Sequence, residues 1–158
     1  MSSPIEYLAI RNLQTALQAI TVAGGFYFNV TGAAVKLDPN VMVESLIHPG
    51  GPRPMVLIEV DPEAWEYEPA SQLRLKLPLK VHWVSDATPT DDVSRMEMFF
   101  KGCADIEKAV AVDVSRGGYC SDTRIRRRTF DDAVDGTQVW AIVELELWVR
   151  RTYGQPSV

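Results

Sequence analysis

Between Leu73 and Val84, apolar and polar residues alternate so regularly that the segment fixes one element of the fold. The odd positions are apolar and the even ones mostly basic or polar, namely Leu73, Leu75, Leu77, Leu79, Val81 and Trp83 against Arg74, Lys76, Lys80 and His82. Successive side chains of a strand point to opposite faces, so we predict a strand roughly 40 Å long with one dry and one wet face. Helices should cover the dry face, while the other meets water or another subunit. Pro78 cannot donate a ladder hydrogen bond, which predicts an edge position or a bulge.

A second long strand is predicted near the C-terminus, because Val139 to Arg150 shows the same alternation. One set of alternating positions is apolar throughout, namely Val139, Ala141, Val143, Leu145, Leu147 and Val149. The other set includes Trp140, Ile142 and Trp148 and is too apolar to face water alone. We therefore predict an exposed apolar patch at these three residues, where a partner or another subunit binds.

Two helices are predicted. The first covers Pro4–Val22, with a helix-start pattern around Ser3, Pro4 and Glu6 and a stop at Gly24-Gly25. The second runs from the acidic start at residues 90–92 to about residue 112. Its predicted apolar stripe consists of Val93, Met96, Phe100, Cys103 and Val110. A glycine within it, Gly102, would allow close packing.

The remaining β-prone runs complete the fold. Phe26–Val30 and Ala33–Leu37 predict a small hairpin, and Met55–Val60 predicts a central strand because it is almost continuously apolar. The order of helix, strands, helix and strands predicts an α+β fold with a mixed, largely antiparallel sheet and two helices packed on one face. We expect residues 1–158 to form a single domain, with residues 154–158 as a flexible tail.

A basic run supplies further candidates for contact. Arg124, Arg126 and Arg128 fall on one face of the strand predicted over residues 124–130. They can bind phosphates, protect an exposed sheet edge, or pair with the glutamates of the last strand.

Two loops offer candidates as well. Trp65 and Tyr67 lie in an acidic, proline-bounded segment, where they either anchor a partner or fold back onto the sheet. Residues 38–54 are rich in proline and glycine, which fits either an ordered surface loop or an arm that touches a neighbouring subunit.

The sequence contains no recognisable pattern for catalysis. His48 and His82 are far apart, and the spacings typical of zinc sites, nucleophile elbows and phosphate loops are absent. The aspartates Asp91, Asp92, Asp131, Asp132 and Asp135 can bind a metal, but a helix start and a turn explain them. We therefore predict no catalytic residue, cofactor or metal; the alternative is a small metal-dependent hydrolase that uses these aspartates.

Composition excludes further classes. The formal net charge of −5 opposes general binding to nucleic acid, which needs a positive field. The two cysteines, Cys103 and Cys120, do not make a disulfide framework, so a reduced cytoplasm is the simpler setting. No signal peptide is recognisable, and no apolar run approaches the ~20 residues that a membrane helix needs. We expect no membrane association.

Short motifs follow one another in a distinctive order along most of the chain. They are Ala23-Gly24-Gly25-Phe26-Tyr27, Val35, Pro54-Met55-Val56-Leu57-Ile58, Asp105-Ile106-Glu107-Lys108-Ala109, Gly117-Gly118 and Trp148-Val149-Arg150-Arg151-Thr152-Tyr153. With the predicted order of elements, they resemble the tail terminator proteins of long-tailed bacteriophages and their prophages.

The resemblance implies a structural subunit that assembles as a hexameric ring, caps the tail tube once its length is set, and offers a surface to the head. Its partners would be further copies of itself, the tail tube protein and a head-completion or connector protein. DNA would pass through the ring without sequence-specific binding. The protein would be assembled in the host cytoplasm and lie at the head-proximal end of the virion tail. The runner-up is another head–tail connector or a tail-tube component.

Overall fold

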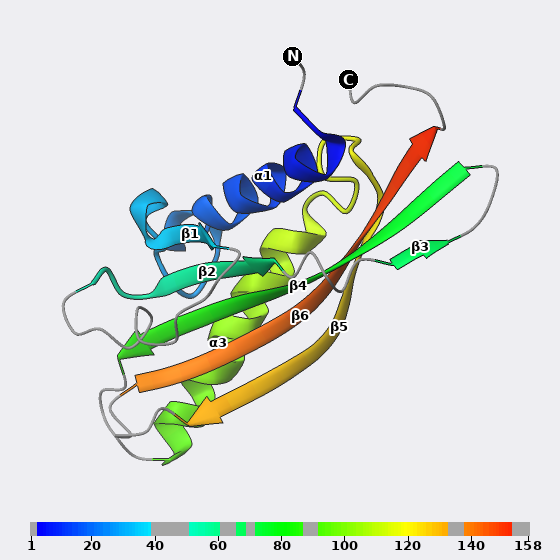
Figure 1. Ribbon diagram of the computed structural model, residues 1–158. Helices are drawn as coiled ribbons and strands as arrows, with labels where there is room; N and C mark the ends of the chain where they lie inside the picture. Colours follow the sequence, from blue (N-terminus) through cyan, green and yellow to red (C-terminus); the bar gives the residue numbers. More distant parts are fainter. Residues whose placement is uncertain are drawn as a thin grey trace.

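The computed structural model describes residues 3–38, 51–60, 66–68, 72–86, 92–132 and 138–152 (Figure 1). In chain order the elements are α1 (Ile5–Gln18), the 3₁₀ turns η1 (Val22–Gly24) and η2 (Gly32–Ala34), β1 (Val35–Asp38), β2 (Met55–Val60), β3 (Glu66–Glu68), β4 (Gln72–Asp86), α3 (Asp92–Ala111), β5 (Cys120–Asp132) and β6 (Gln138–Thr152).

The strands form one sheet in the order β1-β2-β4-β6-β5, with β3 also paired to β4. All pairs are antiparallel except β1 with β2. Both α1 and α3 lie on the same face of this sheet (Figure 1). The prediction of an α+β fold with a mixed, largely antiparallel sheet and helices on one face is confirmed.

The alternation in β4 and β6 places the core as predicted. Leu75, Leu77 and Val81 of β4 are at most 1% exposed and belong to the main core beneath the helices. The apolar set of β6 lies opposite them in register, for example Leu147 opposite Leu77. Fully burying one such side chain contributes about 1.5–3 kcal/mol, so the several buried side chains of this two-strand seam stabilise the fold substantially.

Pro78 lies in a central strand, so the expected edge position of the strand is wrong. The reason that the proline is tolerated is local. The ladder with β2 ends at the pair Val60–Leu79, and the ladder with β3 begins at the pair Glu66–Lys76. Pro78 therefore falls at a break between two partner strands, where a residue without an N–H is least costly.

Helix α3 approaches the sheet most closely at Gly102, as its sequence suggested. A Cβ atom at Gly102 would lie only 2.7 Å from the ring of Trp83, which is fully buried on β4. The predicted apolar stripe is wrong at Met96 and Phe100, which are 45% and 51% exposed. The inward face runs instead through Phe99 and Gly102, because the sheet lies directly beneath the glycine.

The predicted hairpin over residues 26–37 is not formed. β1 runs parallel to β2, and residues 26–30 adopt no strand. The buried carboxylate of Asp105 on α3 explains this, since it accepts hydrogen bonds from the backbone N–H groups of Tyr27 and Phe28 at 2.9–3.0 Å. Backbone groups bound in this way do not form the ladder between two hairpin strands.

The first helix is shorter than predicted, because it ends at Gln18 rather than Val22. Thr21 instead caps the turn η1, where its hydroxyl accepts a hydrogen bond from Gly24 N–H at 3.1 Å. The N-cap is Pro4 rather than Ser3, and no side-chain hydrogen bond caps this end of the helix, so the predicted role of Ser3 and Glu6 in the helix start is wrong.

Candidate interaction surface

The face of the sheet opposite the helices carries most of the residues that the sequence singled out. At one end of this helix-free face lies a small apolar cluster of Met55, Leu57, Val84 and Trp140, with Ile142 packed against it. Trp140 is only 7% exposed. The prediction of an exposed apolar patch is therefore wrong for Trp140 in the isolated subunit, because the cluster buries its ring. A partner contact at Trp140 and Ile142 remains a prediction.

A hydrogen-bonded chain leads from this cluster toward the middle of the face. Trp140 Nε1 donates to Nδ1 of the buried His82 at 3.1 Å, and His82 Nε2 lies 2.6 Å from Glu59 Oε2. An indole nitrogen only donates, so His82 Nδ1 must accept and the imidazole proton sits on Nε2, facing the carboxylate. The chain fixes the tautomer of His82 and holds Glu59 in place.

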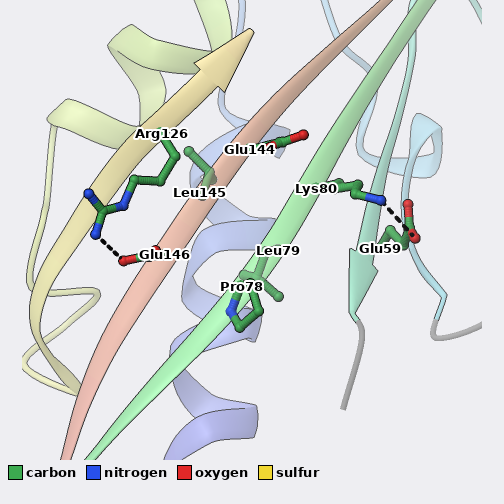
Figure 2. A pocket seen from close by; sticks show the side chains of 8 residues that line it. All are labelled: Glu59, Pro78, Leu79, Lys80, Arg126, Glu144, Leu145 and Glu146. Carbon is green, nitrogen blue, oxygen red and sulfur yellow. Dashed lines mark hydrogen bonds and ion pairs between the residues drawn. The ribbon is translucent and has the colours of Figure 1, made fainter. Parts of the chain in front are cut away.

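The middle of the helix-free face is hollowed into a groove with a volume of about 460 Å³ (Figure 2). Its lining comes from β2, β4, β5 and β6 and consists of Glu59, Pro78, Leu79, Lys80, Arg126, Glu144, Leu145 and Glu146. On one side Lys80 pairs with Glu59 at 3.8 Å, and on the other Arg126 pairs with Glu146. The carboxylate of Glu144 lies between these pairs and forms no ion pair with the part of the chain that the structure describes.

Hydrogen bonds keep the Glu146 carboxylate in the groove ionised. Burial raises the pKa of Glu146, but hydrogen bonds from Arg126 and Trp148 outweigh it and hold that pKa below the ordinary value. Three carboxylates and two cations line the groove, and Glu144 lies in register between Lys80 of β4 and Arg127 of β5. Acidic and basic side chains therefore alternate around the groove.

Trp148 marks the other end of the face. Its ring centroid lies 4.9 Å from Lys76 Nζ and 4.3 Å from the guanidinium carbon of Arg124. Its Nε1 donates to Glu146 Oε2 at 3.1 Å. Cation–π contacts on a half-buried ring fix its orientation, so Trp148 is a rigid part of this surface.

The three arginines of β5 do not share a face, contrary to the prediction. A bulge interrupts the pairing with β6 between Ile125 and Arg127, so the side-chain alternation shifts by one residue. Arg124 lies opposite Glu146 on the helix-free face, whereas Arg128 lies opposite Val143 on the helix side. The extra residue, Arg126, reaches the groove.

Each of these arginines has an acidic partner within the subunit. Arg124 pairs with Asp122, Arg126 with Glu146, and Arg128 binds both carboxylate oxygens of Glu107 on α3. The pairing with glutamates of the last strand that the sequence left open is therefore found for Arg126, whereas Arg124 and Arg128 pair with acidic residues of β5 and α3. The sequence predicted the glutamate partner of Arg126 correctly. It did not predict Glu107 as the partner of Arg128, because the alternation of residue types along β5 does not reveal the bulge.

Of the two loop aromatics that the sequence singled out, only Tyr67 lies in a described element. Trp65 lies outside the described residues, as do residues 39–50 of the proline- and glycine-rich segment over residues 38–54. Tyr67 belongs to β3, where its backbone pairs with Leu75 of β4. A contact between these aromatics and a partner stays a prediction.

Groups capable of chemistry are few among the described residues. No three His, Cys, Asp or Glu side chains gather there closely enough to hold a metal ion. Burial raises the pKa of the Cys103 thiol to about 11 and that of Cys120 to about 12, so neither is a ready nucleophile. Neither described helix combines the length and apolarity needed to span a lipid bilayer.

No family model matches the chain, and no curated protein matches it in sequence. Among solved structures, one chain from the virion of a native gene transfer agent particle has a similar fold, with a TM-score of 0.51 and 13% sequence identity. The similarity covers 88% of this chain and 92% of that chain. At this identity it establishes a shared fold, which spans nearly the whole of both chains.

Proposed function

We propose that the protein is a structural component of a phage or prophage virion, and that it closes the end of the tail tube as a ring. The observation that carries the proposal is the shared fold, because a subunit of this architecture occurs in the virion of a gene transfer agent particle. The order of motifs that resembles the tail terminator proteins narrows the role to the head-proximal end of the tail.

In this role a ring of copies, a hexamer by the resemblance, covers the growing end of the tube and stops further addition of tube subunits. Its opposite side binds a head-completion or connector protein. Single copies stay apart at low concentration, because one contact is weak, and the tube end raises their effective concentration. DNA passes through the ring, and the net charge of −5 limits any hold on its phosphates.

Deleting the gene from its phage tests the proposal. We expect filled heads without tails, together with free tails of uncontrolled length, counted by electron microscopy. Purified protein added early in assembly should restore head joining. Tails of normal length that lack only a tip would indicate a baseplate role, and unjoined tails of normal length would indicate a connector; either result overturns the terminator role.

A further inference from the structure

We propose that His82 is an acid-sensitive latch on Trp140. The neutral imidazole holds the Trp140 indole in the small apolar cluster of the helix-free face, and a second proton on the imidazole releases it. The latch is independent of the virion role proposed above, because it consists of contacts within one subunit.

The imidazole of His82 is bonded through both of its nitrogens. Trp140 Nε1 donates to His82 Nδ1 at 3.1 Å, and His82 Nε2 lies 2.6 Å from Glu59 Oε2. An indole nitrogen donates but does not accept, so the bond to Trp140 exists only while Nδ1 carries no proton. The observed arrangement therefore requires the neutral imidazole, with its proton on Nε2.

A second proton on the ring changes these two bonds in opposite ways. It can bind only at Nδ1, because Nε2 already carries a proton. The Nδ1–H and the indole N–H of Trp140 would then be two donors that face each other, which abolishes their hydrogen bond. The bond from Nε2–H to Glu59 persists and gains strength from the new positive charge. Protonation of His82 therefore removes the acceptor of Trp140 without separating His82 from Glu59.

The charges around the imidazole oppose one another. The side chains directly opposite His82 in register on β2 and β6 are apolar. The charged side chains of the described strands on this face near the ring are Glu59, Lys80 and Glu144, with Asp86, which pairs with Arg53, further along β4. The carboxylates favour a second proton on His82, whereas Lys80 and the burial of the ring oppose it. Histidine side chains in peptides titrate near pH 6.5, so pH 8 to pH 5 is the range in which to look for release.

Trp140 belongs to a small cluster rather than to the main core. Four buried residues form this cluster, and Trp140 is the aromatic member. Its ring and the imidazole are tilted by 45° at a centroid distance of 5.7 Å, so they do not stack face to face. A tryptophan ring covers a large apolar area, so movement of this one side chain exposes apolar surface beside Ile142.

Nuclear magnetic resonance of the full-length protein tests the latch directly. The four tryptophans give separate indole N–H signals, and Trp140→Phe identifies the one that belongs to Trp140. We expect the protection of this N–H against solvent exchange, corrected for the intrinsic effect of pH, to fall about tenfold between pH 8 and pH 5, as loss of one hydrogen bond predicts. The midpoint should coincide with the protonation of Nδ1 of His82, followed by its nitrogen chemical shift.

Two variants of the latch separate a proton-driven release from a merely structural role. His82→Asn supplies an amide oxygen that accepts from Trp140 and does not titrate, so protection should be equal at both pH values. Glu59→Gln retains an acceptor for Nε2–H but removes the negative charge, so release should move to lower pH by about one unit or more. His48→Asn removes the other histidine and is the matched control, which should leave the midpoint unchanged.

Several results would overturn the proposal. They are an indole N–H of Trp140 that stays protected after His82 has gained its second proton, a loss of protection that persists in His82→Asn, and a release that does not move to lower pH in Glu59→Gln. Far-UV circular dichroism should stay constant between pH 8 and pH 5. Unfolding of the whole domain with the same midpoint would equally overturn the latch, because release would then be part of denaturation.

Discussion

Replacing Gly102 by alanine should destabilise the protein, although the same change in an ordinary helix stabilises it. Alanine gains about 1 kcal/mol of helix propensity over glycine. At this position, however, the new Cβ would lie 2.7 to 2.8 Å from three ring atoms of Trp83, closer than van der Waals contact permits. The indole cannot move away freely, because it is fully buried and packs against Phe28 at a centroid distance of 5.0 Å.

The expected magnitude follows from these opposing effects. Overpacking a well-filled core costs typically 1–3 kcal/mol, and the rigid backing of Trp83 favours the upper part of that range. After subtracting the gain in propensity, we expect Gly102→Ala to lose about 1–2 kcal/mol. For a chain of this size, that corresponds to roughly 3–6 °C in melting temperature.

Urea unfolding followed by far-UV circular dichroism measures the change, since that signal does not depend on the tryptophan. The double variant Gly102→Ala with Trp83→Phe provides the control, because a smaller ring removes part of the clash. The two losses should then be less than additive. If Gly102→Ala proves neutral or stabilising, the close approach of α3 to β4 at this point is wrong.

Three further changes test other parts of the structure by thermal or urea melts. Leu75→Asp should unfold the domain because it buries an unpaired charge, whereas Lys76→Asp on the opposite face should cost about 1 kcal/mol or less; equal losses would refute the register. Asp105→Ala should cost about 2–3 kcal/mol, because the N–H groups of a packed loop lose their acceptor, while amide exchange at Tyr27 should accelerate. Hydrogen bonds from Ser115 lower the pKa of Asp113 in the folded protein. The ionised carboxylate therefore stabilises the fold at pH values above its unfolded pKa of 3.8, and this stabilisation is lost as the pH falls through the lower folded pKa. Asp113→Asn should therefore destabilise the protein more at pH 7 than at pH 2, and an equal loss at both would contradict this.

The sequence predicts those parts of the fold whose signals are local. The alternation from Leu73 to Val84 determined the buried face of β4, because a one-residue slip would expose every leucine. The position of α3 and its close approach at Gly102 also follow from nearby residues. The same alternation predicts which face of the sheet is free of helices and open to contact with another protein.

The features that the sequence did not reveal depend on residues far apart in the chain. The loop at Tyr27 is shaped by Asp105, which lies 78 residues away, so its β-prone composition was misleading. The bulge at Arg126 depends on pairing with β6, and it moves Arg128 to the other face of the sheet. Local pattern carries no information about either interaction, since both arise only when the chain has folded.

The division of the helix-free face into two halves bears on how copies remain separate before assembly. One half hides its apolar side chains, including Trp140, and the other balances Arg126 against Glu146 and Lys80 against Glu59. A surface of paired charges gives a weak and directional contact rather than one held by buried apolar area. Self-association through the charged half of this face should therefore weaken as salt is raised from low to physiological concentration, because partly exposed charges are screened over about 8–10 Å. Sedimentation velocity at two salt concentrations measures this dependence. Association that strengthens with salt would instead show that the copies meet through apolar surface, and a contact through the charged half of this face would have to be abandoned.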